Sequence, residues 1–562
     1  MLHPDPPDAG TGSGHEIGFA ARRVHLQAVT WERIQLSLRL RPSDGRPLVG
    51  TTLRLRRSDG PFLAGPSVEM APTHVEADDS GPAVRFNVMQ GPGQMPLAVG
   101  RWILEASETG SASAAQPIVI EGLETSDAGP ALPAARFDFS QGRYTVSPSL
   151  DPESGVLRLD VGLEPGLPSE PAGPLGPSWV RRLRRSTRRL RPGLFGVLFR
   201  MLRAIPVRNG QRILFSSDSR TELGGNLKIV FERMVELGLD REYRLSTLFK
   251  NDVAAPRTFL DRLRLPWRLA RADVIVVDDY QPIIYRVDDR GMKIVQLWHA
   301  WGAFKTVGYS RVGKPGGPNP YSRVHKNYSY ATVSSTSEVS FYAEAFGIPE
   351  SRVIPTGIPR MDQFFDPDRR KASRAAALAA YPAARDRMTI LFAPTFRGHG
   401  ARSAWYDLAL IDYAGLHAVC VEKDAICIIR MHPFVRTPLR IPEAYTERII
   451  DGSGSSIDVN DLLFAVDLLI TDYSSVVFEF STMDKPMLFF AYDLEDYVAT
   501  RDFYVDYAEF VPGRIVRTFD ALLDAIRRED YDVSRLEAFR ASHLDHFDGR
   551  ATDRVIDLIL GR

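Results

Sequence analysis

Two successive sets of short apolar strands, each alternating with helices, constrain the fold of this chain more than any other feature. The first set is predicted between residues 212 and 354, and the second between residues 389 and 516. Apolar runs without polar alternation are typical of parallel strands that are buried on both faces. Strands alternating with helices form doubly wound sheets. The pattern therefore predicts two Rossmann-type domains, at residues 207–365 and 366–562, that face each other across a cleft. The terminal helices, about Thr518–Arg528 and Arg535–Leu560, are compatible with packing on either domain.

The segment from residue 17 to residue 163 has a different pattern. Its short stretches alternate apolar and polar residues and are separated by Gly, Pro, Asp and Ser, which predicts an antiparallel β-sandwich. No residue pattern in it indicates chemistry, so we interpret it as an interaction or spacer domain. Residues 1–16 are rich in Pro, Gly and Asp and are predicted to form a disordered tail. The clearest alternating stretches are Ile34–Leu40, Thr51–Leu55, Ala83–Val88 and Val156–Val161.

Residues 164–206 join these parts and contain an unusual basic segment. A Pro/Gly-rich stretch is followed by a cluster of arginines and then by large apolar residues from Leu194 to Leu202. This combination suits a segment lying on anionic lipid, where each basic residue contributes roughly 1 kcal/mol near the surface. The alternative is a basic helix whose apolar half packs on the next domain. The residues predicted to contact an anionic membrane surface are Arg181, Arg182, Arg184, Arg185, Arg188, Arg189 and Arg191.

Bulk composition and missing motifs narrow the function classes. Lys plus Arg equals Asp plus Glu at 70 each, so no global charge favours nucleic acid as a partner. Cys420 and Cys427 are the only cysteines, which argues against a disulfide scaffold and favours a cytoplasmic location. No signal peptide and no apolar run of about 18 residues is found. The sequence lacks the GxxxxGK[ST], HExxH, CxxC and GxSxG motifs. Their absence excludes P-loop kinases, zincins, zinc ribbons and serine hydrolases.

Two histidines follow apolar strands of different predicted domains. His299 comes directly after the predicted strand Ile294–Trp298, and His432 after the predicted strand Ala425–Met431. Ligands of open α/β sheets bind beyond the carboxyl ends of the strands, so both side chains can face one cleft. A neutral imidazole can accept a proton from an attacking hydroxyl, and an imidazolium can hold phosphate oxygens. One such histidine often only satisfies backbone groups, but the matched pair predicts two catalytic residues.

Hydroxyl and guanidinium groups at further strand ends predict a phosphate site. Ser474 and Ser475 follow a strand and begin a helix, whose free N–H groups favour phosphate, although simple helix capping is the alternative. Arg397 follows another strand and can clamp a diphosphate. Lys305 and Thr306, after the first histidine, are assigned to the acceptor, with a solvated surface lysine as the alternative. The predicted donor- and phosphate-binding residues are Thr395, Arg397, Arg430, Asp472, Ser474, Ser475 and, toward a ribose diol, Glu479. The alternative for Glu479 is an ordinary position on a helix face, and for Arg430 it is the opposite face of its strand.

With these residues in view, the chain resembles the CDP-glycerol glycerophosphotransferase family, the teichoic acid primases and polymerases. The resemblance covers roughly residues 212–530, and the order and spacing of its motifs make it specific. The motifs are QLWHAWG at 296–302, SYATVSSTSE at 329–338, VIPTGIPRMDQFF at 353–365, ILFAPTFRG at 390–398, IIRMHPF at 428–434 and DVNDLLFAVDLLITDYSSVVFEF at 458–480.

The resemblance implies a fold and an activity. The fold class would be α/β, a GT-B-like pair of Rossmann-type domains with an N-terminal β-sandwich-like domain. The enzyme would transfer a polyol phosphate, with glycerol phosphate favoured, from a CDP-activated donor to a hydroxyl of a lipid-linked polymeric acceptor, releasing CMP. His299 would be the base and His432 an acid or phosphate-binding partner.

The resemblance also implies a biosynthetic pathway and a cellular location. It indicates teichoic acid or capsular polymer synthesis by a peripheral protein on the cytoplasmic face of the plasma membrane. No cofactor and no protein metal site are predicted, although a divalent cation can accompany the donor diphosphate. A GT-B glycosyltransferase using a nucleotide sugar and a non-catalytic scaffold are the alternatives. The sequence leaves open the polyol, the choice between primase and polymerase, and the oligomeric state.

Overall fold

The computed structural model describes most of the chain and divides it into two compact units. One unit comprises Met1–Ser169 with Val312–Lys314, and the other comprises Glu170–Arg311 with Pro315–Arg562. The predicted tail at 1–16 and the seven predicted membrane-binding arginines between 181 and 191 lie outside the described residues. The described residues are 23–44, 51–59, 69–78, 81–108, 115–123, 132–166, 195–205, 209–250, 259–286, 291–398 and 403–562.

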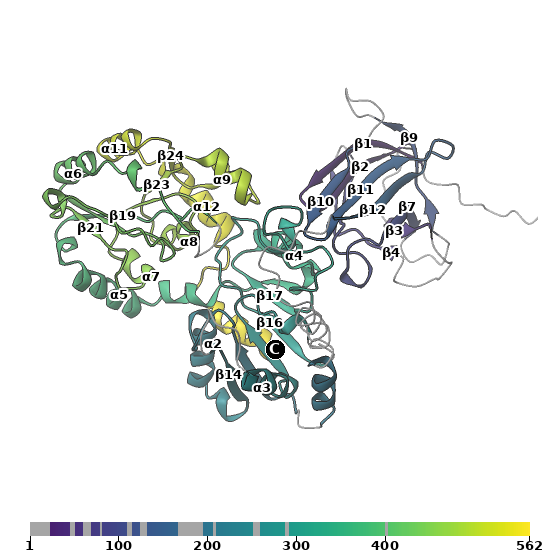
Figure 1. Cartoon of the computed structure of the whole chain (residues 1–562), viewed down its shortest axis with the longest axis horizontal. Coiled ribbons are helices and arrows are strands. Elements are labelled where there is room, and N and C mark those ends of the chain that lie inside the picture. Colours follow the sequence, from purple (N-terminus) through teal and green to yellow (C-terminus); the bar gives the residue numbers. More distant parts are fainter. Residues whose placement is uncertain are drawn as a thin grey trace, which may run out of the picture. The chain divides into compact units, whose positions relative to one another are not determined.

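The first unit contains two sheets, as its period-two pattern predicts (Figure 1). Buried and partly exposed residues alternate along their strands, so each sheet has one apolar face against the core. The five-stranded sheet runs β5 (His74–Asp78), β6 (Gly81–Asn87), β2 (Gln35–Pro42), β1 (Arg23–Glu32) and β9 (Val119–Leu123). The other runs β10 (Ala135–Phe139), β11 (Gly142–Leu150), β12 (Leu157–Pro165), β7 (Gly100–Glu108), β3 (Thr51–Arg57) and β4 (Glu69–Met70), with β8 (Gln116–Pro117) paired to β7.

The second unit begins, in its described part, with a helix at 195–203 and contains two parallel six-stranded sheets, which confirms the predicted pair of Rossmann-type domains. The sheet of the N-terminal lobe runs β14 (Arg244–Leu248), β13 (Arg212–Ser216), β15 (Val274–Val277), β16 (Lys293–Gln296), β17 (Tyr330–Val333) and β18 (Val353–Pro355). Its helices include α2 (Gly225–Glu236), α3 (Phe259–Ala270) and α4 (Val339–Phe346). Because the chain reverses its direction of winding between β13 and β15, a crevice is expected at their carboxyl ends.

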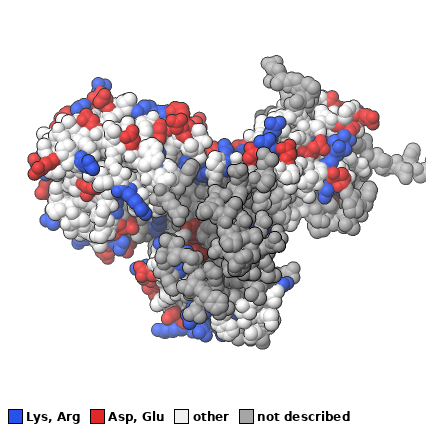
Figure 2. All heavy atoms as spheres, viewed as in Figure 1, with Lys and Arg blue, Asp and Glu red and all other residues white. Residues whose placement is uncertain are grey.

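The C-terminal lobe repeats this plan, with its reversal between β19 and β22. Its sheet runs β21 (Ile449–Asp451), β20 (Ala425–Ile429), β19 (Met388–Phe392), β22 (Leu468–Thr471), β23 (Met487–Phe490) and β24 (Arg514–Val516). Its helices are α5 (Pro367–Ala380), α6 (Tyr413–Glu422), α7 (Val459–Leu463), α8 (Val476–Ser481), α9 (Leu494–Arg501), α10 (Tyr507–Phe510), α11 (Phe519–Arg528) and α12 (Leu536–His543). On the face shown in Figure 2, basic and acidic side chains are interspersed over the described surface of this lobe.

The last helix, α13 (Ala551–Leu560), belongs to the core of the N-terminal lobe. Its apolar residues Val555, Ile556 and Ile559 are buried in the cluster that contains β13 and α2. Arg233 on α2 also pairs with Asp553 at 2.9 Å. The expected boundary of the second Rossmann-type domain at 366–562 therefore does not hold for this helix, because the chain crosses back after α12.

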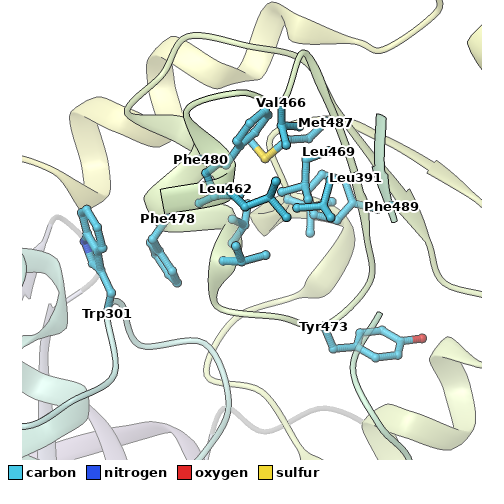
Figure 3. Packing of buried hydrophobic residues seen from close by; sticks show 14 of the residues in the cluster. Trp301, Leu391, Leu462, Val466, Leu469, Tyr473, Phe478, Phe480, Met487 and Phe489 are labelled. Atoms are coloured by element: carbon cyan, nitrogen blue, oxygen red, sulfur yellow. The ribbon is translucent and has the colours of Figure 1, made fainter. Parts of the chain in front are cut away.

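The turn that follows β16 is held between the lobes. Trp301 and Phe304 are buried in the apolar cluster of the C-terminal lobe, and Figure 3 shows Trp301 facing Phe478 of α8. Gly302 has φ +75°, and a Cβ at this position would lie 1.8 Å from the Phe478 ring. Only glycine fits here, because it tolerates the left-handed conformation and lets the two lobes approach this closely.

Candidate active site

A pocket of about 660 Å³ opens where β19, β20 and β22 end in the C-terminal lobe. These strands flank the switch point, which is where open α/β sheets bind ligands. Two residues of the N-terminal lobe, Lys305 and Arg360, complete the wall, so both lobes contribute to one site. The polar residues of the lining are Lys305, Thr395, Arg360, Arg430, His432, Ser455, Ser456, Asp458, Asn460, Ser474, Ser475 and Glu479.

Several polar atoms of this lining are buried without a hydrogen-bond partner among the described residues. They are Thr395 Oγ1, Arg430 Nη1, Arg360 Nε and Glu479 Oε2. Buried polar atoms in folded proteins nearly always have partners, and an unsatisfied one costs about 1–3 kcal/mol. The pocket therefore offers a polar ligand several unpaired hydrogen-bond donors and one unpaired carboxylate oxygen.

Backbone contacts fix which nitrogen of His432 carries the proton. The N–H of Phe434 donates to His432 Nδ1 at 3.1 Å, so Nδ1 is the acceptor nitrogen. A neutral imidazole then holds its hydrogen on Nε2. Burial lowers the pKa of this side chain, and the nearby Lys305 lowers it further, which favours the neutral form near pH 7. His432 is therefore set to donate one hydrogen bond from Nε2.

His299 has the opposite arrangement. Its Nδ1 lies 3.2 Å from the backbone oxygen of Asp278, and a carbonyl can only accept, so Nδ1 carries the hydrogen. Nε2 then presents a lone pair, as a general base requires. The ring does not line the 660 Å³ pocket; it lies on the N-terminal lobe with its side chain 47% exposed. Neither histidine directly continues its strand, because β16 ends at Gln296 and β20 at Ile429, two residues earlier than expected in each case.

A carboxylate lies beside His299 at the end of β15. Asp279 Oδ1 is 3.7 Å from His299 Nδ1. The same carboxylate accepts hydrogen bonds from Ser219 at 2.5 Å and from the Tyr280 N–H at 2.6 Å, which hold it in place. A fixed carboxylate at this distance stabilises an imidazolium when the ring gains a proton. Sequence inspection missed Asp279, because only the parallel pairing of β15 with β16 brings the two strand ends together.

Lys305 brings positive charge to the pocket from the N-terminal lobe. Burial is the main cause that lowers the pKa of Lys305 to about 8; the negative charge of Asp472 opposes this shift, and the positive charges of Arg501 and Arg397 add to it. The ammonium lies 5.5 Å from the ring centroid of Tyr497. Thr306, assigned to the same role, is buried and donates to the backbone oxygen of Arg501 at 3.1 Å, so the structure does not bring it into the pocket.

Arg397 is buried in an ion-pair cluster rather than facing the pocket. Its guanidinium binds Asp493 through two hydrogen bonds of 2.6 and 2.8 Å and Asp472 at 2.9 Å, and it also donates to the backbone oxygen of Thr395. Asp472 in turn accepts from the Thr395 N–H at 2.7 Å. The expectation that Arg397 and Asp472 contact the diphosphate themselves is therefore not supported; they shape the loop that presents Thr395.

Glu479 and Arg430 line the pocket but already have protein partners. Glu479 is 3% exposed and forms an ion pair with Arg360 across the two lobes. Burial raises the pKa of Glu479, and the positive charge of Arg360 opposes that change. Arg430 donates through Nη2 to the backbone oxygen of Ile457 at 2.7 Å, which leaves Nη1 toward the pocket. Ser474 and Ser475 line the same pocket, half-buried and exposed respectively.

A family model of "CDP-Glycerol:Poly(glycerophosphate) glycerophosphotransferase" matches residues 197–561. The chain belongs to this family. As a member, it transfers a polyol phosphate from a CDP-activated donor in teichoic acid synthesis. The family match begins after the β-sheet unit, so that unit lies outside it.

Relatives and solved structures of this family agree with the match. The teichoic acid ribitol-phosphate polymerase TarK of Staphylococcus aureus is 41% identical over 74% of this chain and 81% of its own length. The teichoic acid glycerol-phosphate primase of Bacillus subtilis is 26% identical over 53% of this chain and 76% of its own length. The wall teichoic acid polymerase TagF has a similar structure, with a TM-score of 0.53 at 23% identity over 68% of this chain and 95% of TagF. The last likeness confirms the GT-B-like fold.

The described helices and side chains of this glycerophosphotransferase-family member bear on membrane spanning and metal binding. No helix in the described ranges is long and apolar enough to cross a membrane. Within those ranges, no group of three or more His, Cys, Asp or Glu side chains is placed to hold a metal ion. Arg360 stands in the sequence motif at 353–365, but the motif does not predict a role for it, because its place in the pocket wall depends on how the segment that joins the lobes packs.

Proposed function

We propose that this enzyme is a polymerase that transfers ribitol phosphate from CDP-ribitol to a hydroxyl of a growing poly(ribitol phosphate) chain. The resemblance of the motifs alone favoured glycerol phosphate. Relatives named for ribitol phosphate are 35–41% identical to this chain, whereas those named for glycerol phosphate are 26–28% identical. Three of the four ribitol-phosphate relatives are polymerases, which supports polymerisation over priming.

The observation that carries the proposed chemistry is the pair of backbone contacts that assign opposite neutral tautomers to His299 and His432. Nε2 of His299 takes the proton from the acceptor hydroxyl, whose oxygen attacks the phosphorus of the polyol phosphate. A new phosphorus–oxygen bond forms, the bond to the bridging oxygen breaks, and CMP leaves with the electron pair. Asp279 stabilises the imidazolium that results. Asn226 contacts the backbone of Trp298, which precedes His299, and the backbone of Arg360, which lines the pocket.

The donor diphosphate is held by pocket groups that can still form hydrogen bonds. His432 donates from Nε2, Thr395 Oγ1 and Arg430 Nη1 find the partners that they lack, and Ser474 and Ser475 add hydroxyls. Lys305 supplies a positive charge. We therefore assign Lys305 to the donor rather than to the acceptor, because it lines the pocket together with His432. Such preorganised donors neutralise charge that develops on phosphate oxygens.

The decisive experiment compares donors with the purified enzyme and a short teichoic acid acceptor. CDP-ribitol and CDP-glycerol are offered separately and in competition while CMP release and product linkage are followed. Preference for CDP-ribitol with phosphodiester products supports the proposal. Equal or better use of CDP-glycerol would overturn the choice of polyol. Glycosidic products from a nucleotide sugar would favour the glycosyltransferase alternative, and absence of turnover with both donors would favour a scaffold.

We further propose that the enzyme works as a peripheral protein on the cytoplasmic membrane face, with a lipid-linked acceptor. The support is the arginine cluster at 181–191, which lies outside the described residues. Flotation with anionic liposomes should be lost when these arginines are changed to serine; undiminished flotation would refute the proposal. Divalent-cation dependence stays a prediction for the donor diphosphate alone, tested by CMP release with and without EDTA.

A further inference from the structure

Asn226 is a buried side chain that connects the donor pocket with the backbone just before His299. It is the second residue of α2 and is 2% exposed. Its Nδ2 donates to the backbone oxygen of Trp298 at 2.7 Å. Its Oδ1 accepts from the backbone N–H of Arg360 at 3.2 Å. One amide therefore bridges the segment that carries the base and the segment that carries a pocket residue.

The two partners determine the side chain that this position needs. A carbonyl can only accept and an amide N–H can only donate, so the bridging group must offer one donor and one acceptor at the same time. The asparagine amide offers both at once, because its NH2 group donates and its oxygen accepts. Aspartate would place a second acceptor against the Trp298 oxygen, and leucine of similar size would satisfy neither partner.

At the pocket end of this connection, Arg360 and Glu479 are placed to contact a ligand. The guanidinium of Arg360 pairs with Glu479, and both residues line the donor pocket. Arg360 Nε and Glu479 Oε2 are buried and lack partners among the described residues. A donor that binds these atoms therefore contacts the residue whose backbone Asn226 holds.

At the other end of the connection, Asn226 contacts Trp298, which has an unusual backbone conformation. Trp298 has φ +51°, in the left-handed region that bulky residues rarely occupy. Its N–H donates to Gln296 Oε1 at 2.9 Å and its indole N–H donates to Tyr342 at 3.0 Å. Together with the bond from Asn226 to its carbonyl, these contacts hold the peptide that leads into His299. Strained backbone of this kind persists only where surrounding contacts determine it.

We propose that Asn226 is a positioning residue that aims the imidazole of His299 at the donor by fixing the Trp298–His299 peptide. This inference rests on the proposed role of His299 as the base. It predicts that loss of the amide impairs the chemical step while the donor still binds, because the donor-binding side chains themselves remain.

The first test uses Asn226→Asp. Its kcat should fall by at least about tenfold with the KM for the CDP-polyol within about twofold of wild type, since only alignment in the transition state is lost. Asn327→Asp is the matched control, because Asn327 is also buried in this lobe and its Nδ2 donates to the Ile284 oxygen at 2.6 Å. The control should keep kcat. Equal losses in both variants, or a loss confined to KM, would overturn the inference.

The second test combines Asn226→Asp with His299→Ala. If Asn226 acts through His299, the double variant should be within about twofold of His299→Ala alone, because interacting residues give non-additive effects. Effects that multiply would refute positioning. Full activity of His299→Ala would instead refute the base, and thus separates failure of the proposed function from failure of this inference. If Asn226→Asp does not fold, Asn226→Ser is judged by the same two criteria.

Discussion

The titration of Lys305 gives a quantitative prediction for donor binding. Burial lowers the pKa of this lysine to about 8, so in the free enzyme the ammonium loses its proton within an accessible pH range. Raising the pH from 7 to 9 takes the cationic fraction from roughly nine-tenths to roughly one-tenth. If only the cationic form attracts the diphosphate, donor affinity falls by about tenfold over this range, or ~1.4 kcal/mol.

The charge of Lys305 decides the direction of the pH effect on donor binding. A lysine whose pKa lies near 8 contributes its charge below that pH and loses it above, so binding weakens as the pH rises. His432 does not confound the measurement, because its pKa is lowered from an ordinary value that is already below 7. In Lys305→Arg the charge persists, so the affinity should be nearly constant between pH 7 and 9. In Lys305→Met it should be weak at both values.

Isothermal titration calorimetry of a CDP-polyol with the wild type and both variants at pH 7, 8 and 9 provides the measurement. A constant affinity of the wild-type enzyme across this range would refute the reasoning, as would an equally steep loss in Lys305→Arg. Either result would mean that another group is responsible or that the ammonium does not contact the diphosphate.

Three further substitutions test separate parts of the site. Asp279→Asn should lower kcat by about tenfold or more with unchanged donor KM, because the imidazolium of His299 loses its carboxylate; unchanged kcat would remove Asp279 from the mechanism. Gly302→Ala should destabilise the protein by at least about 2 kcal/mol in urea unfolding, and the double variant with Phe478→Ala should be less destabilised than the sum of the two single variants, since the new Cβ meets that ring. Arg397→Met should cost about 3–5 kcal/mol of stability, because it leaves the buried carboxylate of Asp472 and the partly buried one of Asp493 without their cation; weaker donor binding at unchanged stability would instead support the diphosphate-clamp hypothesis.

Much of the site could be predicted from the sequence because strand ends are local features. Thr395, His432 and Ser474 follow apolar runs, and in a parallel sheet such positions converge at one edge. The structure gathers these residues in one pocket. Arg397 also follows a strand, but its local sequence gives no sign of its partner Asp493, which is 96 residues away. The structure therefore places the Arg397 guanidinium in an ion pair that the local sequence does not indicate.

The sequence by itself determined the parallel strands, the two-lobed plan and the residues at the strand ends, because the spacing of apolar residues sets which side chains a strand buries. Tertiary structure decided where α13 packs, since an amphipathic helix requires an apolar partner but does not specify which. It also decided the proton positions of His299 and His432, which depend on single backbone groups. Likewise, the connection through Asn226 and Arg360 exists only once segments 134 residues apart are folded against each other.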